Sequence, residues 1–406
     1  MSPPFASSGC EILVVGAGPA GSACAIQLAR AGHDVLLVDQ QVFPREKVCG
    51  DGLIPDAHAA LRRLGVAAEV AAEAQHVRHV RCVAPRGASV DVPGTLSVLP
   101  RRRLDQILCD AAQRAGARFA SPWRFEAPLV DGDRVVGARL HGSGEIAEVP
   151  ARWVVLATGA PTQAMTAAGL CERRTPSGIA LRGYVHHPEM HERIRELQVV
   201  WHPRLAGGYG WIFPAPAGRF NVGAGLTGSH LVEHGKGRMR EVNLRSMFDA
   251  FCELHAPARE LMQQGRLEGA LKGAPLRCSL AGARFSRPGL VATGEAIGST
   301  YAFTGEGIGK AMETGLAAAD ALHAGARAPE AETRARYEAA LAALKPRFAL
   351  YETASHVNRR PWLVDLVVWR ARKSPSIRRR MAGVLDETQN PGRLLSWRGI
   401  AKLMFE

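Results

Sequence analysis

The first forty residues alternate between short apolar runs and one segment of helical character. Residues 12–15 (Ile-Leu-Val-Val) and 35–38 (Val-Leu-Leu-Val) are continuous apolar runs, typical of parallel strands that are buried on both faces. Residues 22–31 between them are rich in Ala and Leu, and Gly32 provides a left-handed cap where that helix should end. The pattern therefore predicts a strand–helix–strand unit at the start of a parallel sheet.

Predicted strands and helices continue to alternate along the chain, but the pattern changes between residues 176 and 276. There the strands become longer and aromatic residues more frequent, which indicates a second domain inserted into the first. The predicted fold is α/β: a Rossmann-like dinucleotide-binding domain, an inserted mixed β-sheet domain and a helical C-terminal part. Further helices are expected at 55–72, 101–115, 239–255, 308–324 and 330–356, and further strands at 77–84, 89–92, 134–140, 146–149, 154–156 and 290–293. The predicted dinucleotide domain takes residues 1–75, 101–175 and 277–328, the inserted domain takes 76–100 and 176–276, and the helical part takes 329–406.

Three glycines follow the first predicted strand with a spacing that binds dinucleotides. Gly16 permits a tight turn, Gly18 lets a pyrophosphate approach the backbone, and Gly21 lets the helix pack against the sheet. Asp39 ends the second strand, at the place of an acid that binds a ribose hydroxyl pair. We therefore predict a bound adenine dinucleotide. The remaining residues of the glycine turn belong to the same predicted site: Ala17, Pro19 and Ala20.

Composition adds that the chain is an ordinary globular protein. Of its 406 residues, 47% are hydrophobic and 22% charged, and no apolar run approaches the length of a membrane span. Residues 1–8 have neither a basic start nor an apolar core, so we expect no signal peptide. The eight cysteines include no C-x-x-C pair, which fits a reduced cytoplasm and argues against a metal site.

The net charge of +13 indicates either an anionic binding partner or a solvated surface that is simply rich in arginine. Nucleic acid is not expected, because the arginines are dispersed and no aromatic–basic stripe accompanies them. An anionic membrane surface and a phosphorylated substrate both fit, as does a solvated surface rich in arginine. Residues 378–380 and Lys402, with nearby Trp and Leu, are the candidate membrane-surface segment, which makes the predicted location cytoplasmic and peripheral to a membrane. The alternative for this segment is a helical cap over the inserted domain.

Four separated stretches resemble the geranylgeranyl reductase family of FAD-dependent oxidoreductases, which has the p-hydroxybenzoate hydroxylase-like fold. The likeness covers residues 10–325. The first is the glycine turn, and the other three are Lys47-Val-Cys-Gly-Asp-Gly-Leu53, Tyr209-Gly-Trp-Ile-Phe-Pro214 followed by Gly223-Ala-Gly225, and Gly294-Glu-Ala with Thr304-Gly-Glu-Gly-Ile308. Arg101 with Leu104 and Asp105 also resembles a helix start of the family, where the Arg reaches the cofactor. The chain departs from the family pattern at Glu295, where Asp is usual, at Ala302, where Pro is common, and at Ala157-Thr158-Gly159.

The resemblance implies FAD as the cofactor and adds residues to its site. We assign to it Gly50, Arg101, Thr158, Gly159, Gly294, Glu295, Gly305, Gly307 and Ile308. A helix that begins at residues 305–308 would direct unpaired N–H groups and its positive dipole end at the negative charge of a reduced flavin. An ordinary glycine-rich helix start is the alternative.

Two further predictions concern the reacting end of the site. Reduction of an isolated alkene needs a proton delivered with the hydride, and Cys49 beside Gly50 is the candidate donor. The alternative is a small buried cysteine. Tyr209, Trp211 and Phe213 alternate along an extended segment, so their rings share one face and would line an apolar channel for a prenyl chain; sheet core is the alternative.

The sequence therefore predicts a FAD-dependent oxidoreductase that reduces carbon–carbon double bonds, with Cys49, Tyr209 and Trp211 as its catalytic residues. Its expected substrate is an apolar chain, isoprenoid, prenylated or phosphorylated. NAD(P)H or a ferredoxin is the expected electron donor, and no second dinucleotide motif is present. One alternative is a flavin monooxygenase or halogenase, although the Trp-x-Trp-x-Ile-Pro segment of halogenases is absent. The other is a prenyl-lipid carrier without turnover.

Overall fold

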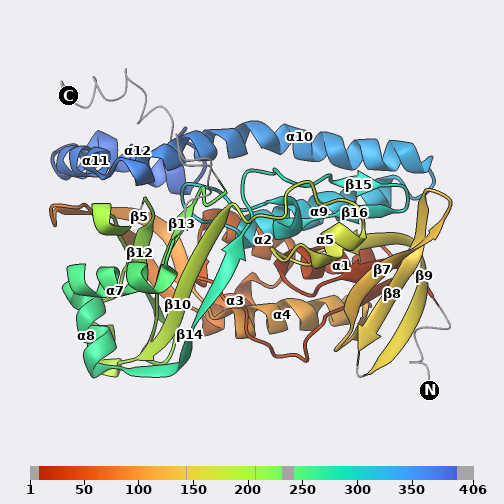
Figure 1. The fold of residues 1–406 in the computed structure, drawn as a ribbon, viewed down its shortest axis with the longest axis horizontal. Helices are drawn as coiled ribbons and strands as arrows, with labels where there is room; N and C mark the ends of the chain where they lie inside the picture. Colours follow the sequence, from red (N-terminus) through yellow and green to blue (C-terminus); the bar gives the residue numbers. More distant parts are fainter. Residues whose placement is uncertain (1–8, 143, 206, 231–241, 391–406) are drawn as a thin grey trace.

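The computed structural model describes residues 9–142, 144–205, 207–230 and 242–390, which form two sheets toward opposite ends of the molecule (Figure 1). The first, sheet A, is a parallel sheet with an antiparallel extension. Along its path the strands are β15 (Ser286–Arg287), β16 (Leu290–Ala292), β9 (Glu145–Leu156), β1 (Cys10–Val15), β2 (Val35–Val38) and β6 (Arg118–Ala120). Strands β7 (Arg124–Asp131) and β8 (Arg134–Gly142) extend it through β9.

The second sheet, sheet B, is mixed and is formed from two separate parts of the chain. Its order is β14 (Arg266–Leu276), β10 (Gly178–His186), β13 (Arg219–Thr227), β12 (Tyr209–Ala215), β11 (Leu197–Val200), β4 (Gln75–Val83), β5 (Ser89–Val98) and β3 (Gly52–Leu53). All of its neighbours are antiparallel except β11 and β4, which run parallel. This pair joins the part before residue 100 to the part after residue 176.

Helices α1 and α4 pack on sheet A, whereas α7 and α8 pack on sheet B, and the last two helices also reach sheet B. Helix α10 runs along one side of the molecule over α9, and α11 and α12 lie at its end, against β5 (Figure 1). The helices of the first half are α1 (Pro19–Arg30), α2 (Pro55–Arg63), α3 (Ala67–Glu73), α4 (Arg101–Arg114), α5 (Gln163–Ala167) and α6 (Pro188–Arg193). Those of the second half are α7 (Leu244–Leu254), α8 (Ala256–Gln264), α9 (Ile308–Ala324), α10 (Glu330–Ala354), α11 (Pro361–Lys373) and α12 (Pro375–Leu385).

The predicted strand–helix–strand start is confirmed. β1 and β2 pair in parallel, with Ile12 opposite Val35, and every side chain of both apolar runs is buried, because both runs lie in one hydrophobic core with side chains of α1, α4 and β8. Pro19 is the first residue of α1, where its missing N–H costs no hydrogen bond. The predicted class, α/β with an inserted mixed sheet and a helical C-terminal part, is confirmed as well.

Two predicted elements differ from the structure. The expected single helix at 55–72 is two helices, because Gly65 between them adopts a left-handed conformation with φ +71°. The strands expected at 146–149 and 154–156 are one strand, β9. Pro150 does not interrupt β9, since the strand there leaves its antiparallel pairing with β8 and begins its parallel pairing with β1 at Ala151.

Other predictions fall partly outside the described residues. Of the helix expected at 239–255, residues 239–241 lie outside them, and the described part is α7. Lys402 also lies outside them. Within the described part of the chain, no helix is both long enough and apolar enough to span a bilayer.

Candidate active site

A cavity of about 880 Å³ is lined from both sheets. Val15 and Ala157 line it at the carboxyl ends of β1 and β9, which is where ligands of open parallel sheets bind. Sixteen of the nineteen residues predicted for the site line this cavity. They are Gly16, Gly18, Pro19, Ala20, Asp39, Cys49, Gly50, Arg101, Thr158, Gly159, Tyr209, Trp211, Glu295, Gly305, Gly307 and Ile308. Segments more than 250 residues apart in the sequence are thus brought together.

The other three predicted residues, Ala17, Gly21 and Gly294, lie beside the cavity without lining it. A Cβ on Gly21 would lie 1.8 Å from the Gly16 carbonyl oxygen, and one on Gly294 would lie 2.6 Å from the Ala20 Cβ. Both glycines therefore allow backbone segments to approach closely around the glycine turn. Ala17 contributes its backbone N–H, which donates a 2.9 Å hydrogen bond to Asp39 Oδ2.

Two helices begin at the wall of the cavity. α1 follows Gly18 and α9 follows Gly307, and neither start has a side-chain cap. Their first N–H groups and positive dipole ends are thus available to an anion. Gly305 adopts φ +73°, and a Cβ there would lie 2.5 Å from the Tyr209 hydroxyl.

Polar groups on the cavity wall also need partners. Among the described residues, the buried atoms Thr158 Oγ1 and Arg182 Nε have no hydrogen-bond partner, although buried polar groups normally have one. Two open helix starts, a glycine turn and unpartnered polar groups around one cavity fit a dinucleotide cofactor with a charged centre and a polar ring.

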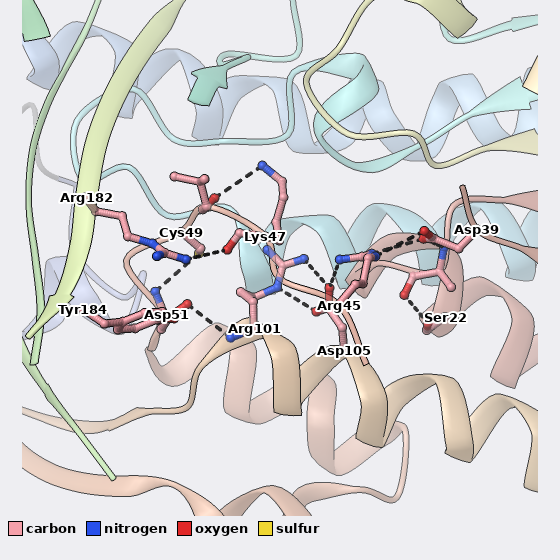
Figure 2. A network of polar contacts seen from close by, with 12 residues as sticks. Ser22, Asp39, Arg45, Lys47, Cys49, Asp51, Arg101, Asp105, Arg182 and Tyr184 are labelled. Atoms are coloured by element: carbon pink, nitrogen blue, oxygen red, sulfur yellow. Dashed lines mark hydrogen bonds and ion pairs between the residues drawn. The ribbon is translucent and has the colours of Figure 1, made fainter. Parts of the chain in front are cut away.

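A buried network of charged side chains runs along one wall of the cavity (Figure 2). Arg45 bridges Asp39, at 3.2 Å, and Asp105, at 2.9 Å. Arg101 pairs with the same Asp105 at 2.7 Å, so two guanidinium groups share one fully buried carboxylate. The network holds Arg101, predicted to reach the cofactor, at a fixed place near Gly18.

Asp51, which was not among the predicted site residues, lies at the centre of a second buried network (Figure 2). Its Oδ2 accepts hydrogen bonds from the Tyr184 hydroxyl and, at 2.8 Å, from Asn221 Nδ2, and its Oδ1 accepts the Arg101 backbone N–H at 3.3 Å. Burial raises the pKa of Asp51 to about 6, although Tyr184 and Arg182 act to lower it. Asp51 can therefore hold or release a proton near neutral pH.

Cys49 lines the cavity two residues before Asp51. Burial is the largest cause of a raised pKa of its thiol, which the charge of Arg101 partly opposes. The thiol is therefore protonated at neutral pH, and a thiolate formed there would have a cation nearby. Its Sγ accepts the Asp51 backbone N–H at 3.4 Å.

The aromatic strand β12 lines the cavity beside the loop of residues 49–52. The rings of Tyr209, Trp211 and Phe213 follow one another at centroid distances of 6.2 and 6.4 Å, and all three line the cavity, so the prediction of a shared face is confirmed. The Trp211 indole donates to Asn221 Oδ1 at 3.0 Å, and the Tyr209 hydroxyl donates to the Thr304 carbonyl at 2.8 Å. β12 is thus tied both to the Asp51 network and to the segment before α9.

The cavity continues into an apolar end. There it is lined by Val80, Cys82 and Val92 from β4 and β5, by Val364, Val367 and Val368 from α11, and by Met381, Val384 and Leu385 from α12. These side chains offer no charge and suit a hydrocarbon chain. The C-terminal helices therefore complete the cavity.

A buried lysine holds these helices to the start of α9. Lys310 Nζ lies 2.5 Å from Glu387, 2.7 Å from Glu313 and 3.5 Å from Asp56. Burial lowers the pKa of Lys310, but the three carboxylates outweigh burial and the net shift is upward. The lysine is therefore charged, and it joins α2, α9 and the segment after α12.

Comparison with known proteins identifies the kind of chain that builds this cavity. Residues 9–199 match the family model described as FAD binding domain. The chain is 32% identical over 330 residues to a menaquinone reductase of Mycolicibacterium smegmatis, covering 78% of this chain and 76% of the relative. It is 28% identical to digeranylgeranylglycerophospholipid reductase 1 of Methanopyrus kandleri, covering 76% and 79%.

Solved structures show the same fold. A geranylgeranyl bacteriochlorophyll reductase-like protein of Thermoplasma acidophilum is 21% identical, has a TM-score of 0.72 and covers 98% of this chain and 96% of its own. Halogenases and a monooxygenase share the fold at 16–19% identity, so the fold alone does not choose between reduction and oxygen chemistry. The sequence relatives do, since they are named as reductases, and the FAD-binding match adds the cofactor: the chain belongs to the geranylgeranyl reductase family of FAD-dependent oxidoreductases.

Proposed function

We propose that the protein reduces carbon–carbon double bonds of an isoprenoid chain, using FAD. One observation carries the proposal: the Cys49 loop, the aromatic strand β12 and the start of α9 line the same cavity that ends between the apolar faces of α11 and α12. A ring system and a long hydrocarbon chain would thus meet at Cys49.

The residues that would hold FAD follow from the same cavity. The start of α1 would bind the pyrophosphate, Asp39 a ribose, and the start of α9 the pyrimidine side of the flavin. When bound and reduced, FAD supplies the hydride. We assign the remaining wall residues Gly50, Arg101, Thr158, Gly159 and Glu295 to the same cofactor.

Cys49 would donate the proton that the second alkene carbon needs. Its thiol stays protonated because it is buried, Arg101 would stabilise the thiolate left behind, and the Asp51 carboxyl would supply the next proton. Tyr209 and Trp211 would hold the alkene against the flavin, since hydrogen bonds fix both rings. Each residue then has one task.

The apolar end and the relatives support a proposal for the substrate class. Proteins named menaquinone reductase and digeranylgeranylglycerophospholipid reductase lead us to propose a prenylated quinone or lipid. Such substrates reside in membranes, which fits a peripheral location and the excess of positive charge. We propose that residues 1–75, 101–175 and 277–328 bind FAD, that 76–100 and 176–276 bind the substrate, and that 329–406 cover it.

An anaerobic half-reaction tests the proposal. The FAD-loaded protein is reduced with dithionite, the excess is removed, and a geranylgeranylated lipid without a quinone ring is added while flavin absorbance is followed. We expect the flavin to reoxidise without oxygen and the product to gain two hydrogens per bond by mass spectrometry. A saturated lipid of equal length is the control.

The other outcomes would contradict the proposal. Reoxidation by oxygen alone, with an oxygenated or halogenated product, would assign a monooxygenase or halogenase. A protein that binds the lipid but no flavin would be a carrier. Repeating the half-reaction with NADPH or reduced ferredoxin in place of dithionite identifies the donor.

A further inference from the structure

Helix α11 has two apolar faces, and one of them is exposed. Its inner face presents Val364, Val367 and Val368 to the cavity. On its outer face Trp362 and Trp369 are 58% and 47% exposed, among the most exposed large apolar side chains of the described residues. At about 100° per residue, the two tryptophans lie within about 20° of one another and roughly opposite Val364. A single helix thickness therefore separates the exposed tryptophans from the hydrocarbon end of the cavity.

Charge accompanies these tryptophans. Between residues 361 and 385 there is one acidic residue, Asp365, and it is paired with Arg86. The basic residues of the same span are Arg370, Arg372, Lys373, Arg378, Arg379 and Arg380. Arg372, Lys373, Arg378 and Arg379 are exposed. Both helices thus present positive charge to the solvent.

Trp369 and its neighbours form a compact unit of ring and cation. The guanidinium carbon of Arg370 lies 5.3 Å, and Lys373 Nζ 4.9 Å, from the centre of the Trp369 ring. Amphipathic rings beside cations are typical of helices that lie in the headgroup region of anionic membranes. A second protein partner would need an acidic surface, whereas an anionic bilayer offers both negative headgroups and an apolar layer.

We propose that the outer face of α11, formed by Trp362, Trp369 and Lys373 and flanked by Arg372 and Arg379, docks on an anionic lipid bilayer. This inference rests on the proposed function, because docking would bring the hydrocarbon chain of a membrane-borne substrate to within one helix of the cavity. It places the main contact on α11 rather than on residues 378–380 and Lys402.

Vesicle flotation of the full-length, FAD-loaded protein tests the docking. Vesicles of phosphatidylglycerol and phosphatidylcholine in equal parts are compared with pure phosphatidylcholine. We expect the wild type to float with the anionic vesicles and to lose binding as salt is raised. The double variant W362A/W369A should bind about fivefold less at equal lipid. The variant R372Q/R379Q should need more lipid and show a weaker salt dependence, because it keeps only two of the four exposed cations of the two helices.

Matched controls separate docking from general effects. I146A removes an equally exposed apolar side chain on β9, and R139Q/R245Q removes the same charge from exposed sites elsewhere; both should float like the wild type. Flavin absorbance reports that each variant is folded. Flotation requires neither reduction nor substrate, so it gives its answer even if the reductase assay fails.

Three results would overturn the inference. The first is a wild type that ignores anionic vesicles, and the second is a W362A/W369A variant that floats as well as the wild type. The third is a wild-type dimer in sedimentation velocity that W362A/W369A dissociates, without vesicle binding. That result would assign the face to a second copy of the chain.

Discussion

Two side chains separated by one glycine differ in what burial does to them. Burial keeps the Cys49 thiol protonated, whereas it raises the pKa of Asp51 to about 6, close to neutrality. A thiol that stays protonated beside an acid that titrates would, in the proposed mechanism, be a donor with a local proton source. Arg101 lies near both, because its backbone N–H contacts Asp51 and its charge acts on Cys49.

We expect Cys49→Ala to slow flavin reoxidation by the alkene about 100-fold, because proton delivery by a positioned group contributes at least about that factor. FAD content, measured by absorbance, should stay unchanged. Cys252→Ala, at a half-buried cysteine of α7, is the control. If Cys49→Ala reoxidises its flavin at the wild-type rate, the thiol has a packing role and is not the proton donor.

The raised pKa of Asp51 also predicts a pH dependence of stability. Between pH 4 and 6 the folded protein holds a proton that the unfolded chain releases, so the free energy of unfolding falls as pH rises through this window. Asp51→Asn should remove a slope worth about 3 kcal/mol over the window. Asn tolerates the left-handed backbone found there, φ +65°. Urea unfolding between pH 4 and 7 measures the slope, and exposed Asp131→Asn should leave it intact.

At the scale of elements, the segment before α9, which we propose to hold the flavin, contacts the aromatic strand. Gly305 has a left-handed conformation, and the Tyr209 hydroxyl occupies the space that a side chain would need. Gly305→Ala should therefore cost about 1–3 kcal/mol of stability and weaken FAD binding. Gly269→Ala is a matched control, because Gly269 has φ +75° with no atom within 4 Å of its added Cβ. Thermal unfolding and FAD titration of both variants test this prediction. If the two variants bind FAD equally well, the start of α9 does not contact the cofactor.

Lys310 connects three elements through one charge. Lys310→Met would leave Glu387, Glu313 and Asp56 without their shared cation, and we expect a loss of about 3–5 kcal/mol. Lys345→Met, at an exposed position of α10, should change stability by less than about 0.5 kcal/mol. Denaturant unfolding of both variants tests this. A small effect at Lys310 would mean that the packing of α12 alone holds the helices.

At the scale of the whole molecule, a cofactor bound in the cavity would link segments that are far apart in the sequence. FAD would contact segments that run from Gly16 to Ile308, so binding should stabilise the folded state as a whole. At a concentration of about 100 times its Kd, FAD should add about 2.7 kcal/mol. Calorimetry of the FAD-free and FAD-loaded protein measures the difference. An unchanged melting temperature would contradict binding at this cavity.

Local patterns predicted most of this architecture, and contacts between distant residues account for what they missed. The glycine turn, the buried strands and the start of α9 each lie within a short stretch, and each was found. Asp51 was missed because Tyr184 and Asn221 lie 133 and 170 residues away in the sequence. Asn221 could have been found from the sequence, because it is a single Asn within the apolar strand β13.

The parallel pair β4–β11 has a consequence for the order of synthesis. β4 ends at Val83, whereas β11 begins at Leu197, and β16 completes sheet A only at residues 290–292. A chain emerging from the ribosome therefore carries β3, β4 and β5 as an unfinished ribbon with a bare edge while more than a hundred further residues are made. Translation speed and chaperone access during that interval should govern the yield of native protein.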